Sequence, residues 1–193
     1  MKNKVTAVID IDGVICNFES AFCDAFGNKN RHLYKLEERY PNLNPDLISE
    51  WANSEENYRD LAPIFGGMLL IQQLKDRGFH VILMTSRGEH LRKVTESWLT
   101  QCYIDVPVMF QTNKAGNIHD WNAGWTVPPV TVFVDDSVSQ LEQVKKLNPS
   151  VTCLAWGQPW NAEYFPRLRY NETNFKIEAN TGLGEWRHIW DYK

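Results

Sequence analysis

Short, nearly continuous apolar runs recur along the chain and predict the strands of its core. The five runs are residues 5–9, 79–84, 107–110, 130–134 and 151–155. They do not alternate between apolar and polar residues, so both faces of each strand should be covered, as in a parallel sheet. We therefore predict a parallel sheet of about five strands.

Helical spacing of apolar residues fills most of the connections between these runs. The positions that mark the helices are Met68, Leu70, Ile71, Leu74, then Leu91, Val94, Trp98, Leu99, and finally Val138, Leu141, Val144, Leu147. Alternation of strand and helix predicts an α/β fold with a Rossmann-like, doubly wound parallel sheet. In such sheets ligands bind beyond the carboxyl ends of the strands.

Polar residues follow the first strand at this edge. Asp10 and Asp12 come directly after the run at residues 5–9, and Gly13 follows them. Two carboxylates so close together repel each other, so the site favours a bound cation. The glycine lets the backbone turn there without steric cost.

Two later strands and one lysine add polar groups to the same edge. The run at residues 79–84 ends on Thr85, Ser86 and Arg87, and the run at 130–134 ends on the pair Asp135-Asp136. Lys114 lies between them and is the only lysine between Lys93 and Lys145. Carboxylates without histidine or cysteine nearby are typical of Mg²⁺.

Composition narrows the class of protein. The chain has 193 residues, 43% of them hydrophobic, which suits one α/β core with a small insertion. A net charge of −4 disfavours nucleic acid as a partner. No apolar run reaches the ~20 residues that span a bilayer. Residues 1–4 directly precede the first apolar run, so we expect no secretory signal there. We expect a cytoplasmic protein. The sequence does not fix the oligomeric state, and a homodimer is one alternative.

In order, the strand-end residues read Asp-x-Asp, Thr, Lys and Asp-Asp, which resembles the haloacid dehalogenase (HAD) superfamily. The resemblance implies a HAD core at residues 1–16 and 63–193. It also implies a helical cap at 17–62, inserted directly after the first motif. Residues 17–62 contain helical spacing and no strand. They are too long for one crossover helix, although a long ordinary connection is the alternative.

The same resemblance implies the roles of the motif residues in phosphoester hydrolysis. Asp10 would attack phosphorus, in keeping with the aspartyl-phosphate intermediates that carboxylates form. Asp12 would protonate the leaving group and then activate water, while Thr85 and Lys114 would bind the phosphoryl group. Asp10, the Asp12 carbonyl and Asp136 would hold Mg²⁺ directly. Asp135 is a further metal residue, and the sequence does not separate it from Asp136.

Three more segments resemble the 5′(3′)-deoxyribonucleotidase family, namely residues 17–22, 58–64 and 185–190. The family resemblance implies a nucleoside monophosphate as substrate. It also implies that cap aromatics stack on its base. Phe18 and Tyr58 fall at matching places, and Trp51 is a further candidate. The alternative is that Phe18 and Tyr58 pack the cap against the core.

The residues after Thr85 depart from the nucleotidase pattern. That family commonly has proline after its Thr-Ser, whereas Arg87 follows Ser86 here. A Thr-x-Arg is similar to the phosphatase domain of polynucleotide kinase-phosphatases, in which Arg87 could bind a second phosphate or a 3′ end. Ser86 and Arg87 are therefore candidates for substrate binding.

Three functions follow from these patterns. The first is a small-molecule nucleotidase. The second is a polynucleotide 3′-phosphatase or another phosphomonoesterase, against which the acidic composition, the large cap and the lack of a P-loop sequence count. The third is a non-catalytic HAD-like binding protein. An intact set of motif residues counts against the third, because a silent protein can lose any of them without cost.

Overall fold

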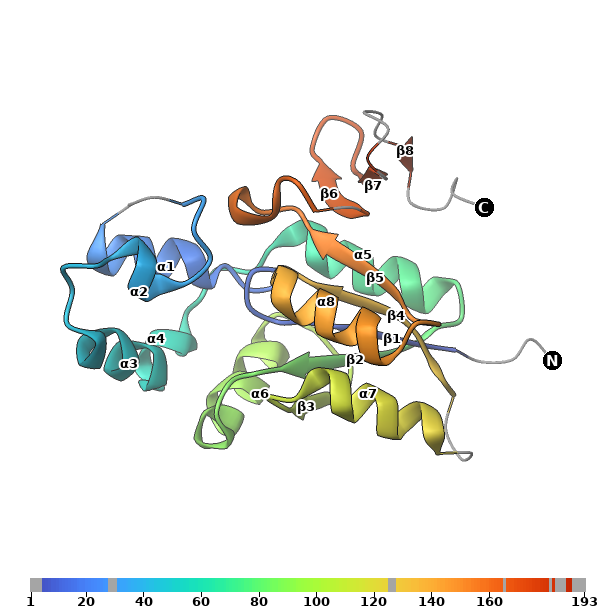
Figure 1. Ribbon diagram of the computed structural model, residues 1–193, viewed down its shortest axis with the longest axis horizontal. Coiled ribbons are helices and arrows are strands. Elements are labelled where there is room, and N and C mark those ends of the chain that lie inside the picture. The colour runs from blue at the N-terminus through green and yellow to red at the C-terminus, as the bar shows by residue number, and fades with distance from the viewer. Residues whose placement is uncertain are drawn as a thin grey trace.

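The structure is a computed structural model that describes residues 5–27, 31–124, 128–164, 166–180, 182 and 187–188 (Figure 1). Its centre is one sheet whose eight strands lie in the order β3-β2-β1-β4-β5-β6-β7-β8. The strands are β1 (Thr6–Ile9), β2 (His80–Thr85), β3 (Val108–Phe110), β4 (Val130–Asp135), β5 (Thr152–Trp156), β6 (Arg167–Asn171), β7 (Lys176–Asn180) and β8 (Arg187–His188).

The first five strands confirm the predicted parallel sheet. β1 lies between β2 and β4 and is parallel to both, while β3 and β5 extend the sheet outward in the same direction. Ala7 and Ile9 point into one apolar core and Val8 points into the other. Both faces of the central strand are therefore buried, as its continuous apolar sequence indicates.

The sheet is larger than the sequence predicts. β6 adds to β5 in parallel, and β7 and β8 follow as antiparallel strands. In β6 only Leu168 is fully buried, while Arg167, Arg169 and Tyr170 remain partly or largely exposed. β6 therefore lacks the continuous apolar run that marks the five predicted strands, although it lies between β5 and β7, and the prediction of about five strands did not include it.

Helices cover both faces of this sheet (Figure 1). They are α5 (Phe65–Asp76), α6 (Arg92–Gln101), α7 (Lys114–Ala123) and α8 (Val138–Leu147), with 3₁₀ turns η1 (Glu89–Leu91) and η2 (Pro159–Asn161). Side chains of α5 and α6 share one apolar core, and side chains of α7 and α8 share the other. The doubly wound arrangement is thus confirmed.

Of the five described helices between β1 and β2, the first four form a separate group beside one end of the sheet (Figure 1). They are α1 (Phe18–Phe26), α2 (Leu36–Arg39), α3 (Pro45–Asn53) and α4 (Glu56–Arg59). The group has an apolar cluster of its own, formed by Phe22, Tyr40 and Ile48. These helices confirm the predicted cap, whereas the domain boundaries at residues 16 and 62 stay predictions.

The ends of α1 and α3 follow from their sequences. The Asn17 side chain accepts a hydrogen bond from the Ser20 amide, 3.1 Å away, and Asn44 does the same for the Asp46 amide at 3.0 Å. Pro45 occupies the first turn of α3, where a missing N–H costs nothing. Asn17 therefore starts the cap directly after the first motif.

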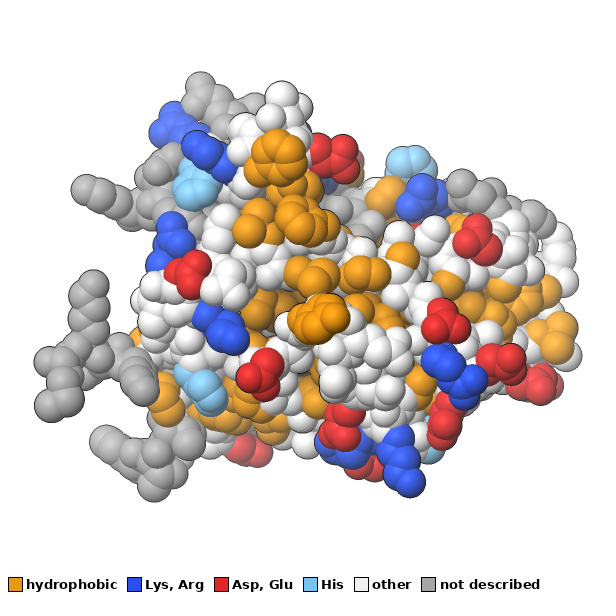
Figure 2. All heavy atoms as spheres, turned by 180° about the vertical axis from the view of Figure 1, so that it is seen from behind, with side chains coloured by type: hydrophobic (Ala, Val, Ile, Leu, Met, Phe, Trp, Pro, Cys, Tyr) orange, Lys and Arg blue, Asp and Glu red, His pale blue; other side chains and the backbone are white. Residues whose placement is uncertain are grey.

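The face turned away from Figure 1 carries a mixture of positive and negative side chains around a band of apolar ones (Figure 2). On α5 the exposed Phe65 ring packs edge-on against Tyr170, with 5.4 Å between the ring centroids. Within the described residues, no helix has the length and apolar character needed to cross a membrane. The expectation that the chain has no secretory signal concerns residues 1–4, which lie outside the described residues.

Candidate active site

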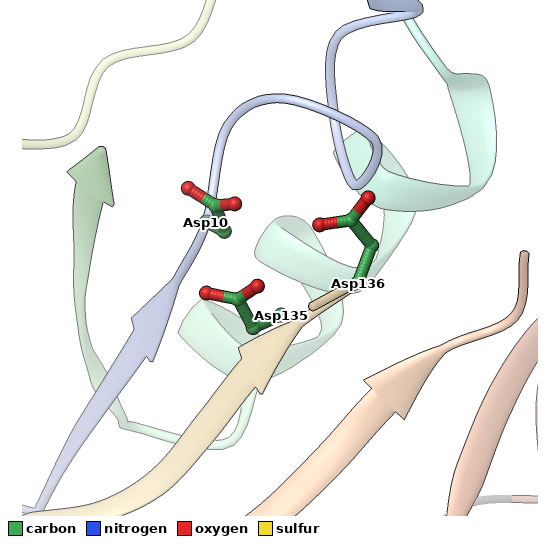
Figure 3. A group of neighbouring side chains, drawn as sticks. All are labelled: Asp10, Asp135 and Asp136. Atoms are coloured by element: carbon green, nitrogen blue, oxygen red, sulfur yellow. The ribbon is translucent and has the colours of Figure 1, made fainter. Parts of the chain in front are cut away.

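Neighbouring strands bring three aspartates together at the carboxyl edge of the sheet. Asp10 follows β1, and its amide donates a hydrogen bond to the Val134 carbonyl of β4 at 2.9 Å. Asp135 ends β4, and Asp136 comes next. One carboxylate oxygen from each of the three lies within 4.8 Å of the others, and all three residues are buried (Figure 3).

Gly13 is required for this close approach. Its φ is +75°, a conformation that favours glycine, and an added Cβ would lie 2.3 Å from the Asp136 Oδ2. The chain therefore leaves the first motif in a turn that only glycine allows beside the Asp136 carboxylate.

Lys114 is buried at the first position of α7 and contacts two of the aspartates. Its Nζ lies 2.7 Å from Asp10 Oδ1 and 2.8 Å from Asp135 Oδ2. Burial lowers the pKa of Lys114, but the charges of Asp10 and Asp135 outweigh it and raise the pKa above its ordinary value. The ammonium therefore stays charged beside both carboxylates.

One ammonium does not balance three buried carboxylates. Burial, followed by the charge of Asp135, raises the pKa of Asp10 to about 7. Burial and the charges of Asp135 and Asp10 likewise raise the pKa of Asp136 well above its usual value. The oxygen-only donor set and this shortage of positive charge fit a hard divalent cation, which Asp10, Asp135 and Asp136 would hold.

We predict that Mg²⁺ raises the melting temperature more at about pH 8 than at about pH 5. Folding raises the pKa of Asp10 from 3.8 to about 7, so the folded state binds more protons than the unfolded state in this window. The free energy of unfolding of the metal-free protein should therefore fall as pH rises through it. A cation replaces those protons and restores stability at the higher pH.

Thermal unfolding in chelator and in excess Mg²⁺ at both pH values tests this expectation. The Asp136→Asn variant is the control, because it lacks one of the three carboxylates. Its melting temperature should respond little to Mg²⁺. A wild-type response of equal size at both pH values would contradict the prediction.

Arg87 binds the second aspartate of the first motif. Its Nε and Nη2 donate to the two oxygens of Asp12 at 2.9 and 2.6 Å, and its Nη1 donates to Thr95 at 3.0 Å. The guanidinium carbon lies 4.4 Å from the centroid of the Tyr58 ring. Arg87 therefore lies at the site, but in this structure its guanidinium donates hydrogen bonds to Asp12 and Thr95.

The other two residues of this strand end differ in exposure. Thr85 is fully buried, and its Oγ1 accepts a hydrogen bond from the Arg87 amide at 3.1 Å. Ser86 is exposed and lines a pocket between the strand ends and the cap. Thr85 lies beneath this surface and is outside the pocket lining.

This pocket has a volume of about 430 Å³. Its core side contains Asp10, Asp12, Arg87, Lys114, Asp135 and Asp136, and its cap side contains Phe18, Glu19, Tyr34, Arg39 and Tyr58. The Phe18 and Tyr58 rings stack with 5.9 Å between their centroids. The structure thus gathers most of the predicted site residues around one space.

Trp51 is the exception among the predicted aromatics, because it is not part of the pocket lining. Its ring meets Phe18 and Phe22 edge-on, with centroid distances of 5.4 and 5.1 Å. Trp51 lies three residues after the buried Ile48 in α3, so both side chains face the same side of the helix. The structure therefore places Trp51 in the apolar cluster of the cap.

A loop that contains none of the predicted site residues supports the motif backbone. The Asn161 side chain donates to the carbonyls of Asp136 and Trp156 at 2.9 and 2.7 Å. Trp160 Nε1 donates to the same Asp136 carbonyl at 3.1 Å, and Gln158 donates to the Gly13 carbonyl at 2.7 Å. These residues directly follow β5, at the edge of the sheet where ligands bind. Their position after a predicted strand is the sequence signal that could have identified them.

Cap residues reach across to this loop. The Tyr34 and Trp160 ring centroids are 6.0 Å apart, and the Arg39 guanidinium carbon lies 5.4 Å from the centroid of the Trp160 ring. Neither Tyr34 nor Arg39 belongs to a motif, so no sequence pattern indicates them. Of the tail pattern at residues 185–190, only 187 and 188 fall within the described part.

No protein-family model and no curated protein matches this chain. Solved structures do. A dehalogenase matches with a TM-score of 0.55 and 12% identity, covering 90% of this chain and 96% of that one. A hydrolase from Pseudomonas syringae matches with a TM-score of 0.51 and 9% identity, covering 89% and 95%.

A chain of the Pnkp1/Rnl/Hen1 complex also matches, with a TM-score of 0.50 and 16% identity, covering 81% of this chain and 48% of that one. This chain thus spans about half the length of that match. At such identities the likeness establishes the fold. Together with the cap helices and the aspartates at the strand ends, it shows that this chain has the fold of the HAD-like hydrolases.

Proposed function

We propose that the chain is a Mg²⁺-dependent phosphomonoesterase of the 5′(3′)-deoxyribonucleotidase type, acting on nucleoside monophosphates. One observation carries the proposal. The buried ammonium of Lys114 lies between Asp10 and Asp135 at the base of a pocket that aromatic cap residues close. A carboxylate nucleophile, fixed positive charge and space for a leaving group are what phosphoryl transfer requires.

In the first step, an oxygen of Asp10 attacks phosphorus and the bond from phosphorus to the leaving oxygen breaks. Asp12 gives its proton to that oxygen. In the second step, water attacks phosphorus, Asp12 takes the proton, and the bond from phosphorus to Asp10 breaks. A bound Mg²⁺ would supply positive charge to the phosphoryl oxygens, as Lys114 does from the protein side.

This mechanism has a consequence for Arg87. Both oxygens of Asp12 accept hydrogen bonds from Arg87, so Asp12 is an acceptor-only carboxylate in this arrangement. For Asp12 to act as the acid of the first step, one of these two bonds must be released when substrate enters and Asp12 must first bind a proton from solvent; the second step then returns that proton to Asp12. Arg87 therefore acts on the reaction through Asp12 in this proposal.

The pocket supports a nucleoside as the leaving group. Its volume of about 430 Å³ falls in the range of small-molecule sites. Phe18 is half-buried and lines the pocket, which leaves part of its ring available to a base. Tyr58 is only 4% exposed and is packed by Phe18 and Arg87. Phe18 is thus the better candidate for stacking.

We predict that Phe18→Ala lowers kcat/KM for a deoxynucleoside monophosphate by roughly five- to a hundredfold more than for phenyl phosphate, the worth of one lost base stack. The two substrates share the phosphate chemistry but differ in the base. Phe18→Leu is the matched control for apolar packing. It should keep the cap folded and still lose most of the preference for the nucleotide.

Tyr58→Ala should behave differently, because it removes packing against Arg87 and Phe18. We expect it to lower kcat/KM for both substrates by similar factors. If Phe18→Ala also reduced both equally, Phe18 would be a packing residue, and the base would have to bind elsewhere.

A substrate panel tests the proposed function as a whole. It contains phenyl phosphate, 5′- and 3′-mononucleotides and a 3′-phosphorylated oligonucleotide, each assayed with Mg²⁺, with Ca²⁺ and with chelator. We expect turnover of mononucleotides with Mg²⁺, little with Ca²⁺ because of its longer ligand distances, and none in chelator. Absence of turnover on every substrate would favour the non-catalytic alternative.

The polynucleotide alternative rests on two observations. One is the Thr85-Ser86-Arg87 sequence, and the other is the structural likeness to a chain of an RNA repair complex, with a TM-score of 0.50. Against it, Arg87 is buried and bound to Asp12, and the chain has a net charge of −4. Faster turnover of the oligonucleotide than of every mononucleotide would favour this alternative.

A further inference from the structure

Glu19 is a buried carboxylate in the wall of the pocket, beside Phe18 at the start of α1. Only 6% of its surface is exposed, yet it lines the pocket. Its partner is Arg39 in α2, which is also buried and also donates to the Leu33 carbonyl through Nε at 3.1 Å. An ion pair holds the carboxylate in place on the cap side of the pocket.

The contacts of Glu19 are one-sided. The Arg39 Nη1 donates to Oε1, the Arg31 Nε lies 3.6 Å from the same oxygen, and the Cys23 thiol donates to it at 3.4 Å. Among the described residues, no hydrogen bond or ion pair reaches Oε2. A carboxylate can accept several hydrogen bonds, so Glu19 retains unused acceptor capacity.

Oε2 is not among the fully buried side-chain atoms that lack a partner, so water can reach it while the pocket is empty. A ligand that displaces this water is disfavoured unless it brings a donor of its own. The pocket that Glu19 lines is the space in which the leaving group would lie. A group that brings an N–H or O–H to Oε2 would therefore be favoured over one that brings none. Phenyl phosphate, for example, has no such donor on its ring.

We propose that Glu19 is a specificity-determining residue whose Oε2 accepts a hydrogen bond from an N–H or O–H of the leaving group. This inference rests on the proposed phosphomonoesterase function. It names the substrate class more closely, as phosphate esters with a donor-bearing leaving group. A nucleobase and a sugar hydroxyl are the two sources of such a donor.

Glu19→Gln is the sharpest variant. Arg39 can only donate, so the carbonyl oxygen of the new amide should stay on the Arg39 side and the NH₂ group should face the pocket. A donor would then meet the donor of the leaving group. The matched control is Glu38→Gln in α2, which removes the same charge from an exposed side chain outside the pocket lining.

The experiment measures kcat/KM for a deoxynucleoside monophosphate, deoxyribose 5-phosphate and phenyl phosphate. We expect Glu19→Gln to lower the ratio of the nucleotide to phenyl phosphate by roughly ten- to a hundredfold, the effect of losing a hydrogen bond to a charged group. Glu38→Gln should leave this ratio within about threefold of wild type. Melting temperatures of all variants report on folding.

Binding gives a second readout that does not depend on turnover. In the Asp10→Asn background, calorimetric titration with the same nucleotide should show a Kd raised by a similar factor when Glu19→Gln is added. If Glu19→Gln does not fold, Glu19→Gln combined with Arg39→Gln takes its place, since it removes both buried charges.

The outcomes are distinct. A fall for deoxyribose 5-phosphate equal to that for the nucleotide places the donor on the sugar, and a fall for the nucleotide alone places it on the base. Equal losses on all three substrates, or an unchanged Kd, would overturn the inference and leave Glu19 as a packing partner of Arg39. If the wild-type protein turned over none of them, the proposed function itself would fail.

Discussion

Asp10→Asn should reduce kcat by at least about a thousandfold on every phosphate ester, because the amide cannot form the covalent intermediate. It also removes one of the three carboxylates that would hold the metal. The fold should survive the change. The raised pKa of Asp10 shows that burial disfavours its charged form, and Lys114 keeps Asp135 as a partner.

Single-turnover and steady-state rates on phenyl phosphate measure this effect, with the melting temperature as the check on folding. Asp120→Asn is a suitable control, since Asp120 is exposed on α7 and contributes nothing to the pocket. Turnover by Asp10→Asn within tenfold of wild type would exclude Asp10 as the nucleophile.

The central sheet was predictable because its strands are buried on both faces. Such strands have continuous apolar sequences, and parallel strands bring their carboxyl ends to one edge. Asp10, Asp135 and Asp136 could therefore be placed together from the amino-acid sequence alone. Lys114 is different, since it starts a helix. Only its position in the order of the motifs pointed to it.

The rest could not be predicted because it depends on contacts between distant segments. Glu19 and Arg39 look like ordinary surface charges of short helices, and only the packing of α1 against α2 buries them. Arg87 was assigned to substrate, although the structure pairs it with Asp12, 75 residues away. Trp51 is of a residue type that often stacks on ligands. Its position three residues after Ile48, however, directs its side chain toward the apolar cluster of the cap.

The second large effect is expected for Lys114→Met, which removes the ammonium and keeps an unbranched side chain. Lys114 would stabilise the charge that develops on the phosphoryl oxygens, so we expect kcat/KM to fall roughly a hundred- to a thousandfold. The variant should also be less stable at neutral pH, by about 3–5 kcal/mol, because Asp10 and Asp135 lose their shared cation in a buried place.

The pH dependence of that loss distinguishes it from simple repacking. Burial and Asp135 already raise the pKa of Asp10 to about 7, and removal of Lys114 takes away the charge that holds it down. At about pH 5 Asp10 binds a proton and no longer needs a cation, so the free energy of unfolding of Lys114→Met should move toward the wild-type value. Denaturant unfolding at about pH 5 and about pH 8 measures the difference, with Lys93→Met on the exposed face of α6 as control. A destabilisation of the same size at both pH values would mean that Lys114 stabilises the protein by packing. Its ion pairs with Asp10 and Asp135 would then not account for the loss in the free energy of unfolding.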